Sequence, residues 1–296
     1  MADTDPVTSD DSWTVRRIIA WTTDHLARRG SDTPRLDAEV LLAHSRRCQR
    51  IDLYTRFDDV LTDEERARMR DLVRRRAQSE PVAYLVGHRE FFSLDFEVTP
   101  AVLIPRPDTE TVVVELLEAL RDVSAPRVLD LGTGSGCIAV AVAAGHPRAQ
   151  ITATDISAAA LEVAGRNARQ HDVADRIRFL CGNLFKPLPP DERFEAVVSN
   201  PPYIRAEEFQ TLQSDVRLHE PVSALIGGRD GLDVIRPLID RAADYLTPGG
   251  TLMLEISPEQ ATTVTELLTA AGVLSDIAVV KDLAGKERVV RARRND

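Results

Sequence analysis

This chain of 296 residues has few cysteines, few aromatic side chains and no long apolar run. Its three cysteines, Cys48, Cys137 and Cys181, are too far apart for a disulfide framework or a metal-binding knuckle. We therefore expect small buried side chains and no metal site. The lack of a long apolar segment excludes a transmembrane helix. The N-terminus begins Met-Ala-Asp-Thr-Asp and lacks the apolar core of a signal peptide, so we expect a cytoplasmic protein.

Positive charge is also scarce in one part of the chain. Residues 1–85 carry 16 acidic and 15 basic side chains, whereas residues 86–296 carry 31 acidic and 22 basic ones. Most of the net charge of −10 therefore lies in the second part. Phosphate contacts need Lys and Arg, so we expect no direct nucleic-acid partner, and nothing indicates a membrane partner. The sequence does not fix the oligomeric state, and we expect a monomer.

The first part of the chain has the sequence pattern of helices. Apolar residues recur at helical spacing through residues 12–77, which predicts a small helical bundle over residues 1–86. Pro34 is a suitable first residue for the second helix. Thr62 and Glu65 form a capping box for a third helix that runs to about Arg76. We interpret the arginine run 74–76 as a solvated helix face.

Residues 87–107 change to a period of two, which predicts a β-hairpin that links two domains. A helix follows, with Asp108 as its predicted N-cap. Strands and helices then alternate to the end of the chain, which predicts an α/β domain over residues 108–296. Its fold would be a doubly wound, Rossmann-like, seven-stranded sheet with helices on both faces. The predicted strands are 127–131, 151–155, 177–180, 194–199, 251–256, 277–280 and 288–290.

A glycine-rich loop follows the first of these strands. It contains Gly132, Thr133, Gly134, Ser135 and Gly136, and glycine permits positive φ and close approach to a ligand. The dinucleotide fingerprint would require a third glycine where Cys137 stands, and a phosphate-binding loop would require Gly-Lys-Ser/Thr. Asp130, just before the loop, suits a cationic α-ammonium group and would repel a pyrophosphate. The loop therefore fits S-adenosyl-L-methionine better than NAD or ATP.

Two further polar residues follow predicted strands. Asp155 ends the second strand and can accept hydrogen bonds from both hydroxyls of a ribose. It could instead cap the next helix, but Ser157 is available for that role. Asn183, after the third strand, is either a partner for an adenine amino group or an ordinary turn residue. Asp130, Asp155 and Asn200 all end strands, so we expect them to face one crevice.

The stretch Asn200, Pro201, Pro202 and Tyr203 follows the fourth strand. The prolines make the loop rigid and hold Asn200 and an exposed Tyr203 in place. The Asn200 side-chain oxygen and the Pro201 carbonyl can each accept one N–H of a planar NH2 group. Tyr203 can pack on the flat acceptor group. These features predict methyl transfer to an amide or exocyclic amine, without metal or covalent intermediate.

These motifs resemble a class I methyltransferase that acts on planar NH2 groups. More closely, the chain is similar from end to end to the HemK/PrmC-type glutamine N5-methyltransferases. Residues 89–94, 103–110 and 282–288 and the helical N-terminus carry this closer match. The resemblance implies methylation, by S-adenosyl-L-methionine, of the glutamine in the Gly-Gly-Gln motif of class I peptide-chain release factors. It also implies that the bundle helps to dock the release factor.

One departure from the family and three alternatives stay open. Relatives often have an acidic and an aromatic residue after the third strand, where this chain has Asn183-Leu184-Phe185, so the adenine contact is not fixed. A glutamine methyltransferase of a ribosomal protein would use the same chemistry. A DNA adenine N6-methyltransferase would need a basic target-recognition region, which is not found here. A cofactor-binding regulator would not need the acceptor loop.

Overall fold

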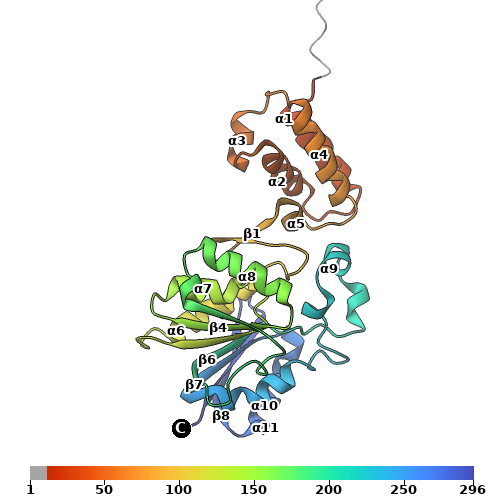
Figure 1. The fold of residues 1–296 in the computed structure, drawn as a ribbon. Helices are drawn as coiled ribbons and strands as arrows, with labels where there is room; N and C mark the ends of the chain where they lie inside the picture. Colours follow the sequence, from red (N-terminus) through yellow and green to blue (C-terminus); the bar gives the residue numbers. More distant parts are fainter. Residues whose placement is uncertain (1–11) are drawn as a thin grey trace, which may run out of the picture. The chain divides into compact units, whose positions relative to one another are not determined.

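The computed structural model describes residues 12–296, which form two compact units that divide between Val86 and Gly87 (Figure 1). The prediction about a signal peptide concerns residues 1–11, outside that range. Among the residues described, no helix is long and apolar enough to cross a membrane.

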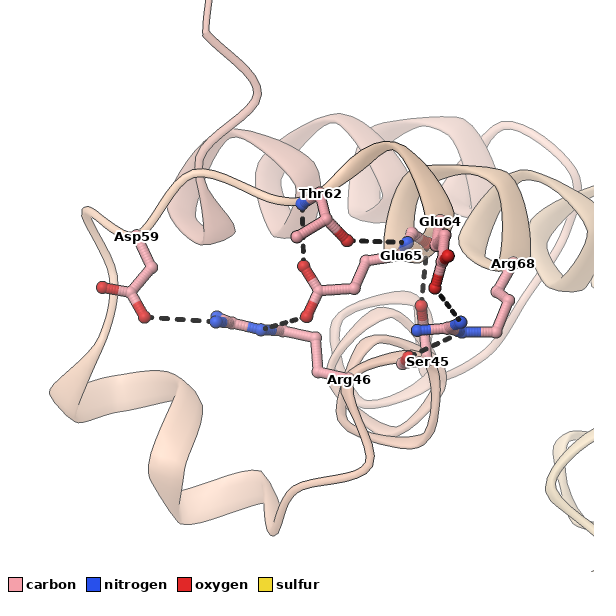
Figure 2. Close-up of polar contacts among 7 residues, drawn as sticks. All are labelled: Ser45, Arg46, Asp59, Thr62, Glu64, Glu65 and Arg68. Atoms are coloured by element: carbon pink, nitrogen blue, oxygen red, sulfur yellow. Dashed lines mark hydrogen bonds and ion pairs between the residues drawn. The ribbon is translucent and has the colours of Figure 1, made fainter.

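The first unit is helical. Its helices are α1 (Val15–Ala27), α2 (Pro34–Arg46), α3 (Arg50–Thr55), α4 (Asp63–Arg76) and α5 (Val82–Val86). Pro34 is the first residue of α2, as predicted. The predicted capping box is also present, because Thr62 Oγ1 accepts from Glu65 N at 3.2 Å and Thr62 N donates to Glu65 Oε2 at 2.9 Å (Figure 2).

The same glutamate joins two helices. Arg46, at the end of α2, donates to Glu65 at 3.3 Å and to Asp59 at 3.1 Å (Figure 2). The start of α4 is thereby tied to the end of α2. The interpretation of residues 74–76 as a solvated face is wrong for Arg76, whose guanidinium lies 2.7 Å from the buried carboxylate of Asp37.

The second unit begins with a hairpin of β1 (His88–Phe91) and β2 (Leu94–Glu97). Its remaining helices are α6 (Glu110–Ala119), α7 (Cys137–Gly145), α8 (Ala158–Gln170), α9 (Ser214–His219), α10 (Ile235–Tyr245) and α11 (Ala261–Ala271). Its remaining strands are β3 (Arg127–Leu131), β4 (Gln150–Asp155), β5 (Ile177–Cys181), β6 (Phe194–Ser199), β7 (Leu246–Glu255), β8 (Leu274–Lys281) and β9 (Glu287–Arg294).

These seven strands form one sheet in the order β5-β4-β3-β6-β7-β9-β8. The first five strands in this order are parallel, and β9 is antiparallel to both of its neighbours. Apolar side chains of α6, α7 and α8 pack on one face, and those of α10 and α11 pack on the other (Figure 1). The predicted fold class is confirmed. Strand order reverses between β3 and β6, and ligands of such sheets bind at that switch.

Three local predictions are wrong. Strand structure ends at Glu97, although Val98, Val102 and Ile104 are buried as the pattern suggested. Asp108 is not an N-cap, because it lies inside a 3-10 turn (Pro107–Thr109) and its carboxylate pairs with Arg288 at 2.8 Å. Cys181 is exposed rather than buried, because it ends the edge strand β5.

Candidate active site

A cavity of about 460 Å³ lies at the carboxyl ends of the parallel strands in the second unit. This volume falls within the usual range for small-molecule sites. Its lining includes the following residues predicted from the sequence: Gly132, Gly134, Asp155, Asn183, Asn200, Pro201 and Pro202. The fold thus brings the glycine loop and the acceptor loop, which are far apart in sequence, to one cavity.

The glycine loop between β3 and α7 needs its glycines for conformation. Gly132, Gly134 and Gly136 have φ of 73°, 55° and 80°, in the left-handed region that favours glycine. A Cβ at position 132 or 134 would meet no atom within 4 Å, so the space beside this part of the loop is open. A Cβ at position 136 would lie 3.0 Å from Ala164 Cβ, so this glycine lets α7 begin close against α8.

Asp155, the last residue of β4, holds the glycine loop directly. Its Oδ2 accepts from Gly134 N at 2.9 Å, and its Oδ1 accepts from Ser157 N at 2.9 Å. Ser157 caps α8 through its own hydroxyl, which accepts from Ala160 N at 3.1 Å. The carboxylate is therefore not the cap of this helix. It lines the cavity and remains half-buried there.

Asp130 does not line the cavity. Side chains alternate along a strand, so Asp130 points away from the face of Leu129 and Leu131, which pack with α10 and α11. Its Oδ2 accepts from Thr133 Oγ1 at 2.6 Å, whereas its Oδ1 is buried with no partner among residues 12–296. Burial raises the pKa of Asp130 to about 7, and nearby Asp155 adds to the effect.

The other predicted cofactor residues also fall into two groups: those that do not line the cavity and those that do. Thr133 and Ser135 belong to the glycine loop, but both are buried and neither lines the cavity. The Ser135 carbonyl accepts from Asn167 Nδ2 at 2.8 Å. Asn183 is exposed at the mouth of the cavity, after β5. The structure thus separates residues that hold the loop from residues that face the ligand space.

The acceptor loop follows β6. Asn200 is half-buried, and its Nδ2 donates to Thr109 Oγ1 at 3.1 Å. Tyr203 is not exposed as expected: it is half-buried, packs against the core and does not line the cavity. Its hydroxyl donates to Glu255 Oε1 at 3.4 Å. Burial, and then the charge of Glu255, raise the pKa of Tyr203.

Sequence reasoning missed several residues around this loop. Thr109 and Glu255 are both 1% exposed, and neither belongs to a recognisable polar motif. Glu220, also buried, pairs with Arg106 at 2.5 Å and accepts from Ile104 N at 3.2 Å. These contacts hold residues 104–109 beside the cavity. The only available signal was the closer family match over residues 103–110.

Comparisons with known proteins place similar proteins in one family. Residues 17–87 match the family model of the PrmC N-terminal domain, and residues 107–218 match that of the methyltransferase small domain. The release factor glutamine methyltransferase of Rhodopirellula baltica is 46% identical over 294 residues, which cover 98% of each chain. That of Geobacter sulfurreducens is 46% identical over 281 residues, covering 95% of this chain and 97% of the relative.

Solved structures resemble the sheet domain. A methyltransferase from Pyrococcus furiosus aligns with a TM-score of 0.51 at 20% identity, covering 70% of this chain and 91% of the other. The hMettl16 catalytic domain aligns with a TM-score of 0.56 at 17% identity, covering 70% and 77%. At these identities the likeness concerns the fold.

Proposed function

This chain belongs to the family of release factor glutamine methyltransferases, and from that membership we propose its substrate. We propose that it transfers a methyl group from S-adenosyl-L-methionine to the side-chain amide nitrogen, N5, of the glutamine in the Gly-Gly-Gln motif of class I peptide-chain release factors. The observation that carries the proposal is that Asn200, Pro201 and Pro202 line the same cavity as the glycine loop and Asp155.

The residues present fit the cofactor. The open space beside Gly132 and Gly134 lets a ligand approach the backbone closely. Asp155, at the end of β4, offers a carboxylate for ribose hydroxyls. Asn183 is the candidate for the adenine contact. Asp130 lies beneath the glycine loop and does not line the cavity, so its proposed role is to hold the loop through Thr133. When bound, the cofactor supplies an electrophilic methyl group on a sulfonium centre.

The acceptor loop supplies orientation and charge stabilisation. An amide nitrogen is a poor nucleophile because its lone pair is delocalised into the carbonyl. We propose that Asn200 Oδ1 and the Pro201 carbonyl each accept one N–H of the substrate amide, so that its lone pair points at the methyl group. These bonds strengthen as the nitrogen gains positive charge, which is preorganised electrostatic stabilisation. Alignment of reacting groups can supply roughly 7–11 kcal/mol of the barrier.

The first unit is proposed to dock the release factor. In support, this unit has its own apolar core and a hollow of about 570 Å³. The hollow combines an aromatic pair with basic side chains: Trp13, Trp21, Arg29, Arg66 and Arg70. Trp21 is 47% exposed, and aromatic and arginine side chains are common at the centre of protein interfaces. On this proposal the domains are residues 1–86, the hairpin linker 87–107 and the catalytic domain 108–296.

The partners and location follow from the same proposal. We propose a monomer that acts in the cytoplasm on release factors, without direct contact to nucleic acid or membrane. The acidic charge of residues 86–296 disfavours a DNA substrate. The names of the curated relatives favour release factors over ribosomal proteins.

Mass spectrometry tests the proposal. Purified release factor, ribosomal proteins and DNA are each incubated with the enzyme and isotope-labelled S-adenosyl-L-methionine. We expect one labelled methyl group on the Gly-Gly-Gln glutamine of the release factor. Label on a ribosomal protein or on DNA instead would overturn the proposed substrate.

A further inference from the structure

A buried side-chain amide holds the end of the acceptor loop. Gln260 is the last residue of a short 3-10 turn (Pro258–Gln260) that leads into α11, and it is 4% exposed. Its Nε2 donates to the Tyr203 carbonyl at 3.1 Å and to the Gly231 carbonyl at 3.1 Å. Its Oε1 accepts from Ser257 N at 3.2 Å. Both hydrogens of the amide are therefore bonded to backbone carbonyls.

The direction of this amide is fixed by its partners. A backbone N–H can only donate and a carbonyl can only accept, so the oxygen of Gln260 must face Ser257 N and the NH2 must face the two carbonyls. Burying an amide costs free energy unless new hydrogen bonds replace those to water, and an apolar side chain of similar size would avoid that cost. The three hydrogen bonds offset it. The polar group at this position is therefore explained by its contacts rather than by packing.

The turn at Gly231 and the acceptor loop are in direct contact. Gly231 has φ of 78°, and a Cβ there would stand 2.3 Å from the Tyr203 carbonyl oxygen and 2.6 Å from Gln260 Nε2. Just after Tyr203, Ile204 N donates to the Leu225 carbonyl at 2.9 Å. The two prolines before Tyr203 have no N–H and cannot donate backbone hydrogen bonds themselves. The loop is thus anchored directly after its prolines.

We propose that Gln260 is a positioning residue for methyl transfer: by holding the Tyr203 carbonyl, its amide fixes the direction of the Pro201 carbonyl. The inference rests on the proposed function, because it concerns the same acceptor loop. Consecutive prolines make a stiff segment, so its direction is set at its two ends, by β6 before it and by Tyr203 after it. Gln260 itself does not line the cavity, so it acts through the loop.

Gln260→Glu changes only one end of this side chain. Glutamate keeps the oxygen that Ser257 N needs, since Ser-x-x-Glu is also a capping box. It replaces the NH2, so the Tyr203 and Gly231 carbonyls would face an oxygen. Even a protonated carboxyl offers one hydrogen in place of two. Gln260→Met removes the hydrogen bonds without adding charge, and it decides the test should Gln260→Glu fail to fold.

The kinetic test uses the full chain, intact release factor and saturating cofactor. We expect Gln260→Glu and Gln260→Met to lower kcat by roughly 10²-fold, the scale of a small misplacement, with cofactor affinity and the KM for release factor largely unchanged. Gln170→Glu is the matched control, because this amide donates to the Asp95 carbonyl at 2.7 Å at the exposed end of α8. The control should behave as wild type. A wild-type kcat in the Gln260 variants would overturn the inference.

A double-mutant cycle separates positioning from a general loss of stability. In an Asn200→Ala background the loop already lacks one acceptor, so Gln260→Met should lower the single-turnover rate much less than it does in wild type. A merely structural role would lower the rate by the same factor in both backgrounds. That outcome would contradict the inference.

Hydrogen exchange supplies a readout that does not depend on the substrate. The amides of Ile204 and Ala206 donate to the carbonyls of Leu225 and Gly228, both at 2.9 Å. They should exchange faster in the Gln260 variants than in wild type or Gln170→Glu. Unchanged exchange would show that Gln260 does not hold the loop. If exchange rises but wild type does not methylate glutamine, the proposed function is wrong and the support of the loop by Gln260 stands.

Discussion

Gly227 lies directly against the backbone carbonyl of Pro202: a Cβ atom at position 227 would stand 2.4 Å from that oxygen. It would also stand 2.6 Å from the Gly231 carbonyl, so neither side offers space. The backbone around Gly227 therefore packs directly against the backbone of the acceptor loop. The bridge between Ile204 and Ile226 fixes the two segments side by side.

Gly227→Ala should push the acceptor loop out of position. Because the crowding atoms belong to the backbone, they cannot move aside as a side chain would. We expect kcat on release factor to fall by roughly 10²-fold, as for other small misplacements, with cofactor affinity largely kept. Steady-state kinetics and calorimetry measure the two. Gly165→Ala in α8, whose nearest atom would be 3.7 Å away, is the matched control and should behave as wild type.

Asn200→Ala should abolish transfer and leave cofactor binding nearly intact. Removing one preorganised partner of a transition state typically costs about 10²–10³ in rate. Asn200→Asp should fail almost as badly, because it loses the Nδ2 donor to Thr109 that fixes the side-chain orientation. Single-turnover methylation of release factor measures both. Near-wild-type turnover by the alanine variant would refute the acceptor-site proposal.

Asp155→Ala should weaken cofactor binding. The variant loses the proposed ribose acceptor and also the contact that fixes Gly134. Hydrogen bonds to charged groups are worth about 1.5–3 kcal/mol each, so we expect a loss in that range or above. Calorimetry on the folded protein measures it, with the exposed Asp175→Ala as control. Equal affinity in the two variants would contradict the assignment.

Asp130→Asn should stabilise the protein at alkaline pH. The pKa of Asp130 is raised from 3.8 to about 7, so the folded state keeps a proton that the unfolded chain has released. The free energy of unfolding therefore decreases as the pH rises from 3.8 through about 7. The amide removes this penalty, and one pKa unit corresponds to about 1.4 kcal/mol, so a shift of about three units predicts a gain of up to roughly 4 kcal/mol.

Urea unfolding at about pH 5 and about pH 8 checks the sign. The advantage of Asp130→Asn over wild type should be larger at the higher pH, where the wild-type carboxyl is ionised. An advantage that does not change with pH would show that the buried carboxyl titrates at its ordinary value.

Deleting residues 1–86 should leave a folded catalytic unit that still binds cofactor, because each unit has its own apolar core. The truncated enzyme should methylate intact release factor poorly, since remote contacts hold the glutamine in register. The full-length and the truncated enzyme should methylate a short Gly-Gly-Gln peptide at equal rates. If intact release factor is methylated at the full rate by the truncated enzyme, the first unit has another role.

Local patterns in the sequence were sufficient to predict most of the helices and strands. The capping box at Thr62 and Glu65, Pro34 at the start of α2, and the alternation of strands and helices are properties of neighbouring residues. The same holds for the glycine loop, whose residues must adopt positive φ. The two motifs end strands, and parallel strands align their carboxyl ends, so their meeting was also predictable.

The directions of the site's side chains and their partners distant in sequence were decided by the tertiary structure alone. Asp130 turns under the loop because alternation in β3 points it at the face covered by α6, α7 and α8. Tyr203 points inward, where its hydroxyl donates to Glu255, a buried carboxylate at the end of β7. Asp108 pairs with Arg288 instead of capping a helix.

The hydrogen bond from Asn200 to Thr109 joins residues 91 positions apart, and the bond from Tyr203 to Glu255 joins residues 52 apart. Such pairs leave no periodic or local signal, because they depend on which strands become neighbours in the sheet. The sequence by itself therefore determined the elements, the fold class and the two loops that meet. The folded sheet decided which groups stand behind those loops, since only packing brings distant side chains into contact.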